Sequence, residues 1–415
     1  MNTRAISLEQ APPLWVPAGF FVLAPVALAA AGALLLTHGG GLLATGWSPL
    51  TMALTHLGTL GLLGSVMLGA LYQMVPVVAG VPVPAVRAAG LVQALWVLGV
   101  GCLVGGLVLG QPWMMRTAMA ALSLALLAFL LPTARALSLA NHTPTVNGMR
   151  VALLGLAGVG ALGLALAAGH AGLLQVPQRA VTLRLHLTMG LVVWVGGLLS
   201  AVSWQVVPMF YLARPVPRWG QLSVLGGVAL SAVLPWCGLW MDSPTAVLLG
   251  ATPGLVAVFL LHPILTLSSL HHRRRKRRDE SLRGWQLGML SALLTALLLP
   301  FAQLSDDPRL PLLVAWVAIG GWAGLVLHGM LSRILPFLVW FHRYSALAGL
   351  QDVPSMKDLL PDRTVAVGVA LHAGAVVLGA SAIVSGQDLL ARAAGALLLA
   401  CAAWFAAWMG RVLSG

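Results

Sequence analysis

Two of the eleven histidines open similar hydrophobic stretches. One stretch reads HLGTLG from His56 and ends in LGALYQMVP at Pro76. The other reads HLTMG from His186 and ends in LLSAVSWQVVP at Pro208. The step from histidine to proline is 20 residues in the first stretch and 22 in the second. Two neutral imidazoles on matching helices are what a low-spin haem needs at its axial positions. The repeated pattern therefore predicts that His56 and His186 are haem ligands.

The surroundings of both histidines fit this prediction and one alternative. Each lies about five residues inside the outer end of its stretch, which is roughly 7–9 Å of helix at 1.5 Å per residue. Each would need a partner for its other ring nitrogen, and Thr55 and Thr188 are nearby candidates. Small residues beside them would let a flat macrocycle approach the backbone: Gly58, Gly61, Gly64 and Gly190. Alternatively, each histidine bonds a neighbouring helix and the glycines serve close helix packing.

His328 and His372 suggest a second site, in the inner half of the membrane. His328 lies about 17 residues into the tenth apolar run from outside, and His372 about nine residues into the eleventh from inside. On consecutive antiparallel helices they could bind a second haem or a metal ion, with Met330 or His342 near. The alternative is a pair of structural histidines.

The elements that must position these histidines are membrane-spanning helices. The chain is 59% hydrophobic and 8% charged, with a mean hydropathy of +0.94. Apolar runs of about 20 residues can each cross the roughly 30 Å hydrocarbon core as a helix. We count twelve runs: about 15–37, 50–79, 88–110, 113–137, 149–171, 182–212, 220–240, 245–269, 285–304, 311–340, 364–385 and 389–412. The predicted fold is an all-α polytopic membrane protein.

The runs also repeat in groups of four. A third stretch, GWAGLVLHGMLSRILP, ends at Pro336 and has Trp316 twenty residues before that proline, where the other two stretches have a histidine near the outer end. Spans 2, 6 and 10 are thus related, which indicates internal repeats. We expect a single transmembrane domain over 1–415, with three pseudo-repeats at roughly 15–137, 149–269 and 285–412 and a basic cytoplasmic loop at 271–283.

The net charge of +13 follows the loops of this predicted topology. With both termini inside, the outer loops hold only Arg116, Arg179 and Arg309. The inner loops hold most other basic residues, including the run HHRRRKRR at 271–278. This is the positive-inside pattern, so we interpret the run as a topology anchor near lipid headgroups and expect no nucleic-acid partner.

The sequence does not favour ion-coupled transport, hydrolysis or nucleotide binding, because the residues that these functions need are missing from the spans. All ten acidic residues fall in loops or at span ends, whereas ion-coupled transporters usually need a carboxylate at mid-membrane. No motif for hydrolysis or nucleotide binding is present. The cysteines are isolated within spans, without C-x-x-C-H, and are expected to be small packing residues: Cys102, Cys237 and Cys401.

The stretch 54–76 resembles the haem-ligand helix of heme-copper oxidase catalytic subunits, above all the C-type oxidases. That helix carries H-x-H, a Gly-rich turn and G-A-L-Y-x-x-x-P, and its low-spin haem ligand falls on His56. The ligand of the catalytic haem falls on Leu54. The stretch RLH at 184–186, followed by WQVV, resembles the other low-spin ligand helix and implies His186 as the second axial ligand. These helices are the tenth and second in the oxidases, so the order here is permuted.

The same resemblance implies that the oxygen-reducing centre is missing. Trp316 occupies the position of the first copper-ligand histidine, and the eleventh span offers only His372 in place of a His-His pair. Copper is therefore not expected, and the protein is not a complete terminal oxidase. Arg116, assisted by Arg184 or Arg179, would pair with haem propionates. Trp113 would pack on the haem rim or be a plain interface tryptophan.

A bis-His haem has no open coordination site, so this reading favours electron transfer. The protein would be a b-type cytochrome with one or two haem b groups in a bacterial inner membrane. A quinol or a periplasmic carrier would be its redox partner. The stretch HGMLSRILP at 328–336 loosely resembles helices of the NnrS family, which implies a haem protein in nitric oxide response. A non-haem membrane transporter is the third interpretation.

Overall fold

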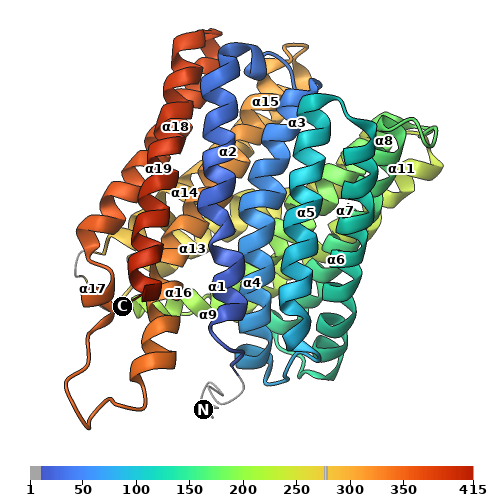
Figure 1. Ribbon diagram of the computed structural model, residues 1–415. Coiled ribbons are helices and arrows are strands. Elements are labelled where there is room, and N and C mark those ends of the chain that lie inside the picture. The colour runs from blue at the N-terminus through green and yellow to red at the C-terminus, as the bar shows by residue number, and fades with distance from the viewer. Residues whose placement is uncertain (1–10, 275, 277–278, 415) are drawn as a thin grey trace. The chain divides into compact units, whose positions relative to one another are not determined.

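The protein is an all-α polytopic membrane protein, as predicted. The computed structural model describes residues 11–274, 276 and 279–414 (Figure 1). Within these residues no strand forms, and the only bridge joins Ala348 and Gln351. Twelve helical spans of this part are long and apolar enough to cross a membrane. Because a chain in hydrocarbon must satisfy its own backbone groups, an apolar sequence of this kind folds as helices, and their outer faces contact lipid.

All twelve predicted spans are present, and most extend a few residues beyond the apolar runs. Their bounds are Trp15–Leu43, Pro49–Ala79, Val86–Leu109, Pro112–Leu139, Pro144–His170, Arg179–Tyr211, Arg218–Trp240, Pro244–His271, Glu280–Leu304, Arg309–Tyr344, Asp362–Ser385 and Asp388–Ser414.

Polar caps set several of the helix starts. Ser48 precedes α3 (Pro49–His56), and its hydroxyl accepts a hydrogen bond from the backbone N–H of Thr51 at 3.0 Å. Thr143 and Ser243 cap α7 (Pro144–His170) and α12 (Pro244–Val256) in the same way. A hydroxyl cap followed by proline satisfies one exposed N–H and fixes the first helical φ. These caps lie outside the apolar runs, which explains why hydropathy places the starts too late.

Among the described spans, Pro244–His271 also has a π-helical part between two α-helices, η8 (Ala257–Leu261), but spans 2, 6 and 10 share a closer plan. Each begins with an α-helix of eight or nine residues, continues as a π-helix and returns to an α-helix. The π-helical parts are η3 (Leu57–Gly64), η6 (Thr188–Gly196) and η9 (Val317–Gly324). They are preceded by α3, α8 (Arg179–Leu187) and α15 (Arg309–Trp316), and followed by α4 (Ser65–Met74), α9 (Gly197–Tyr211) and α16 (Leu325–Tyr344). Such segments are rare and occur often at functional sites. The three predicted repeats stay a prediction, which this shared plan supports.

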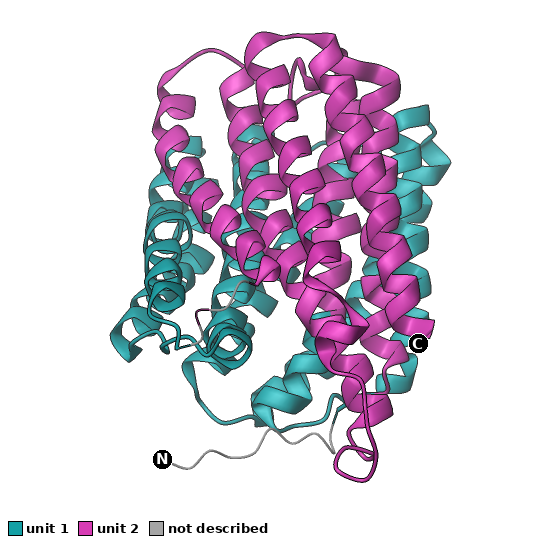
Figure 2. Ribbon diagram, turned by 90° about the vertical axis from the view of Figure 1, so that its left-hand side faces the viewer, with its two compact units in different colours: residues 1–12, 70–275 teal, residues 13–69, 276–415 magenta. Residues whose placement is uncertain are grey.

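The chain forms two compact units, coloured in Figure 2. Unit 1 comprises Met1–Pro12 and Ala70–Arg275, and unit 2 comprises Pro13–Gly69 and Lys276–Gly415. The boundary falls inside α4. This division differs from the three predicted repeats.

Unit 1 is built from neighbouring helices in chain order. Helix α5 (Ala89–Leu109) packs on α6 (Pro112–Leu139), α7 packs on η6 and α9, and α10 (Arg218–Val233) packs on α12. Gly155 of α7 shows how close the backbones come, because a Cβ atom there would lie 2.7 Å from the backbone nitrogen of Trp194. Small residues permit this approach between membrane helices.

Unit 2 joins the two ends of the described chain. Helix α2 (Leu23–His38) packs along α19 (Asp388–Ser414), α19 packs on α18 (Asp362–Ser385), and α14 (Glu280–Leu304) packs on α16 (Figure 1). Gly32 and Gly395 lie where α2 and α19 approach each other closely. A Cβ atom on Gly32 would lie 2.8 Å from the carbonyl oxygen of Gly395, and one on Gly395 would lie 2.7 Å from that of Gly32.

The predicted basic loop lies between α13 (His262–His271) and α14. Arg275, Arg277 and Arg278 of the run at 271–278 lie outside the described residues. On the α14 side, Asp279 caps the helix and accepts hydrogen bonds from Ser281 and from Arg333 of α16. Arg333 also donates to the Ser281 hydroxyl at 2.9 Å. This charged network holds α16 against the start of α14.

Candidate metal and haem ligands

His56 ends α3 with one ring nitrogen bonded to its own helix. Its Nδ1 lies 2.7 Å from the carbonyl oxygen of Met52, four residues earlier. A carbonyl can only accept, so Nδ1 carries the proton and Nε2 carries the lone pair. Metal-ligating histidines usually have this arrangement, because the bond orients the ring and makes the other nitrogen more basic.

His186 has the same tautomer, set by a neighbouring helix. Its Nδ1 donates to the carbonyl oxygen of Val159 on α7 at 3.2 Å. Gly163, one turn later on α7, makes room for the ring, because a Cβ atom there would lie 3.0 Å from His186 Cε1. Both predicted haem ligands thus direct Nδ1 to a main-chain carbonyl and present Nε2 as the basic nitrogen.

The two histidines belong to different units. His56 lies in unit 2 and His186 in unit 1. Their pairing on one haem stays a prediction.

The predicted hydroxyl partners of the two rings are not used. Thr55 donates to the Thr51 carbonyl at 2.9 Å, and Thr188 donates to the Arg184 carbonyl at 2.8 Å. Serine and threonine in membrane helices often bond back to their own helix in this way. The main chain takes the role that the sequence had suggested for these side chains.

The glycines near the histidines serve helix packing, which was the alternative interpretation. A Cβ atom on Gly58 would lie 2.9 Å from Ile319 Cγ2, and one on Gly61 would lie 2.8 Å from Ala27 Cβ. A Cβ atom on Gly190 would lie 3.0 Å from Val159 Cγ2. Neighbouring side chains already fill the space that these three residues leave. They give no separate support to a flat cofactor.

The other predicted haem contacts lie in unit 1. Trp113 and Arg116 are exposed in the first turns of α6. Arg184 is half-buried on α8, and its Nη1 donates to the carbonyl oxygen of Pro244 at 3.5 Å. Their roles toward haem propionates or the haem rim stay predictions.

Two positions that the oxidase resemblance would assign to ligands are occupied by packed side chains. Leu54 is buried in α3. Trp316 ends α15 and donates its Nε1–H to the carbonyl oxygen of Val376 on α18 at 2.9 Å. Gly379 of α18 receives the indole, because a Cβ atom there would lie 2.2 Å from Trp316 Cζ2. The tryptophan therefore has a structural role in unit 2.

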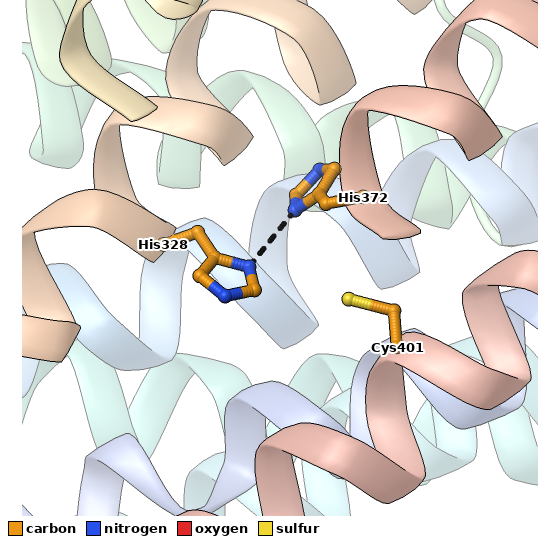
Figure 3. Close-up of side chains that lie close together, drawn as sticks. All are labelled: His328, His372 and Cys401. Atoms are coloured by element: carbon orange, nitrogen blue, oxygen red, sulfur yellow. Dashed lines mark hydrogen bonds between the residues drawn. The ribbon is translucent and has the colours of Figure 1, made fainter. Parts of the chain in front are cut away.

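The structure brings His328 and His372 together, as the sequence predicted for the second site (Figure 3). Their Nδ1 atoms are 3.3 Å apart. The third member of the group is Cys401 of α19, whose sulfur points toward the two rings in Figure 3. One ligand atom from each residue lies within 4.8 Å of the others. We call these three residues the His-His-Cys cluster.

The suggested third partners of this site are not in the cluster. His342 is exposed and lies outside the group of potential ligands. Met330 is two residues after His328 on α16, which is about 200° around the helix axis. Cys401 was expected to be a packing residue. No local spacing links it to His328 or His372, because the three residues lie on three different helices.

No protein-family model matches the sequence, and no curated protein matches it.

Proposed function

We propose that this protein is an integral membrane b-type cytochrome in which His56 and His186 are axial haem ligands. The observation that carries the proposal is the shared tautomer of the two rings. Both donate Nδ1–H to a main-chain carbonyl, which makes Nε2 the nitrogen that carries the lone pair and would bind iron. A bis-His haem is coordinatively saturated and would supply one-electron transfer.

The position of the two histidines in the chain supports the same proposal. His56 immediately precedes η3, and His186 lies two residues before η6. The spans that carry them are the most buried of the twelve in the described chain, at 83% and 78% of their most apolar window. An intramembrane cofactor needs ligands that face protein rather than lipid.

Such a haem would need neutral ligands inside the membrane and charged partners for its propionates near the membrane surface. The imidazoles bind iron without adding charge. The haem propionates are anionic and would pair with Arg116, Arg184 or Arg179 at the outer ends of α6 and α8. We infer a bacterial inner membrane location with both termini cytoplasmic, and a quinol or periplasmic electron carrier as partner.

Haem content of histidine variants tests the proposal. The full chain is purified in detergent, and haem is measured by the pyridine haemochrome assay in wild type, His56→Ala and His186→Ala. We expect haem in the wild type and loss of most of it in both variants. His38→Ala and His170→Ala are matched controls, because each removes an exposed histidine from the same unit.

Three outcomes would contradict the proposal. Unchanged haem in both ligand variants would exclude His56 and His186. A shift of the reduced spectrum by carbon monoxide would show an open coordination site and favour the NnrS-like alternative. Colourless wild-type protein would favour a non-haem transporter.

A further inference from the structure

The His-His-Cys cluster lies inside unit 2 and is sealed from solvent and lipid. His328 and His372 are each 2% exposed, and Cys401 is fully buried. They come from α16, α18 and α19, all in the same unit. Three potential ligands therefore meet in one apolar interior, where a polar group without a partner is costly.

The spacing of the two imidazoles fits a shared metal ion. An ion about 2.0–2.1 Å from each nitrogen, in trigonal or tetrahedral geometry, separates the nitrogens by about 3.3–3.6 Å. The observed separation of the Nδ1 atoms is 3.3 Å. A metal–sulfur distance of about 2.3 Å requires N···S separations of about 3.6–3.8 Å. The sulfur lies within 4.8 Å of one ring nitrogen of each histidine, so small side-chain movements would complete the site.

The surroundings hold both rings with their Nδ1 atoms facing each other. A Cβ atom on Gly368 would lie 2.8 Å from His328 Nε2, and one on Gly324 would lie 3.1 Å from His372 Nε2. These glycines let the far side of each ring rest on a helix backbone. His372 also bonds the backbone of Gly320. Phe405 stacks on the His328 ring with centroids 4.6 Å apart and planes 9° apart.

The presence of Cys401 distinguishes a metal site from a plain pair of structural histidines. A pair of neutral histidines needs only one hydrogen bond between the rings, and any small residue could fill the space beside them. Here the third side chain offers sulfur, and it lies close to the carbonyl oxygen of Gly368, with S···O 3.8 Å. Two imidazoles and a thiolate form a soft donor set, which favours Cu(I) or Zn²⁺ over Mg²⁺ and Ca²⁺.

The net charge of the occupied site favours Cu(I) over Zn²⁺. A thiolate neutralises Cu⁺ but leaves Zn²⁺ with a net positive charge, which is costly in an apolar interior. The next charged residue along α16 is Arg333, and it is already paired with Asp279. We propose that His328, His372 and Cys401 bind one Cu(I) ion. The Cys401 thiol loses its proton as the S–Cu bond forms, and no electron is transferred.

Copper analysis and X-ray absorption test the site. The full chain is purified in detergent, treated with a chelator and loaded anaerobically with excess Cu(I), and unbound metal is then removed. We expect about one copper per chain, with one sulfur and two nitrogen scatterers around it. Copper affinity, measured by competition with a chromogenic Cu(I) chelator, should fall at least about ten-fold in Cys401→Ser, His328→Gln and His372→Gln.

Cys102→Ser is the matched control, because it removes a buried cysteine from unit 1 and should leave the affinity unchanged. The X-ray absorption measurement is made on wild-type protein alone, so misfolding of a variant cannot affect it. Wild type that binds no copper, or copper without a sulfur scatterer, overturns the proposal. Zn²⁺ that displaces Cu(I) at equal concentration overturns the choice of metal. Haem loss in His56→Ala with normal copper content would separate this site from the proposed haem.

Discussion

Main-chain carbonyls determine how the predicted haem ligands are presented. Met52 and Val159 each fix one histidine tautomer, although neither residue carries a side chain suited to chemistry. Sequence patterns identified His56 and His186 because the two stretches repeat. The partner of each ring could not be identified in this way, since every residue has a carbonyl and only the fold selects one.

At the same scale, Gly163 should matter for haem binding through His186. In Gly163→Ala the new methyl group would lie 3.0 Å from His186 Cε1 and push the ring away from the Val159 carbonyl. We expect a lower haem content than in wild type. Gly160→Ala is the control on α7, because its methyl group meets the flexible end of Leu126. Equal haem in the two variants would argue against a positioned His186.

Gly368 plays the corresponding part in the His-His-Cys cluster. In Gly368→Ala the methyl group would lie 2.8 Å from His328 Nε2, and the ring cannot retreat because Phe405 stacks on it. We expect weaker copper binding and a loss of about 1–3 kcal/mol of stability from overpacking. Competition with a Cu(I) chelator and thermal unfolding measure the two effects.

Gly374→Ala is the control for this substitution on the same helix, since its methyl group would meet only the Leu397 side chain, at 3.1 Å. Copper affinity in Gly368→Ala equal to that in Gly374→Ala would contradict the role given to His328.

The place of Cys401 in the His-His-Cys cluster could not be predicted from the sequence. His328 and His372 were linked by depth and by consecutive spans. Cys401 follows His372 by 29 residues on another helix, with no motif around it. A ligand supplied by a distant helix becomes visible only when α16, α18 and α19 are packed.

At the scale of elements, hydropathy predicted the spans but not their internal geometry. An apolar run fit for lipid has no amphipathic period, so it cannot distinguish an α-helix from a π-helix. The π-helical segments η3, η6 and η9 were therefore not foreseen. The relation among spans 2, 6 and 10 was foreseen, from the similar stretches that contain them.

The contact between α2 and α19 should be a main determinant of stability in unit 2. In Gly395→Ala the methyl group would lie 2.6 Å from the Leu36 backbone nitrogen and 2.7 Å from the Gly32 carbonyl oxygen. Backbone cannot yield as a side chain can, so the helices must separate. We expect a lower midpoint of thermal unfolding in detergent, corresponding to about 1–3 kcal/mol.

Gly410→Ala on the same helix meets no atom within 4 Å. Alanine also favours helix over glycine by about 1 kcal/mol, so this control should be neutral or stabilising. A Gly395→Ala variant as stable as Gly410→Ala would show that α2 and α19 are not held together at this point.

At the scale of the whole molecule, charge distribution predicts the orientation of the chain. The positive-inside pattern predicts that both termini and the basic loop are cytoplasmic. A fluorescent protein fused after Ser414 should fluoresce in bacterial cells, and alkaline phosphatase inserted in the exposed loop at 172–175 should be active. The reverse result at both positions would invert the topology, and a disagreement between them would contradict twelve crossings.

The division of the chain into two units could not be predicted from the sequence. Similar stretches indicate descent from a repeated segment, but the grouping of helices depends on long-range packing. Unit 2 combines the first span and the first part of the second with spans 9 to 12. Within it, α2 contacts α19, although almost the whole chain separates the two helices in sequence. No local pattern reports such a contact.

The π-helical segments also bear on how this chain tolerates change in length. A hydrogen bond from residue i to i+5 encloses one residue more than the α-helical bond from i to i+4. Loss of a single codon within η3 or η6 could thus be absorbed by a return to α-helix, with the flanking turns and their histidines kept on their original faces. The same loss within α19 would rotate Cys401 relative to Gly395 or Phe405. η3 and η6 are therefore two segments in which a membrane helix could lose one residue without rotating the turns on either side.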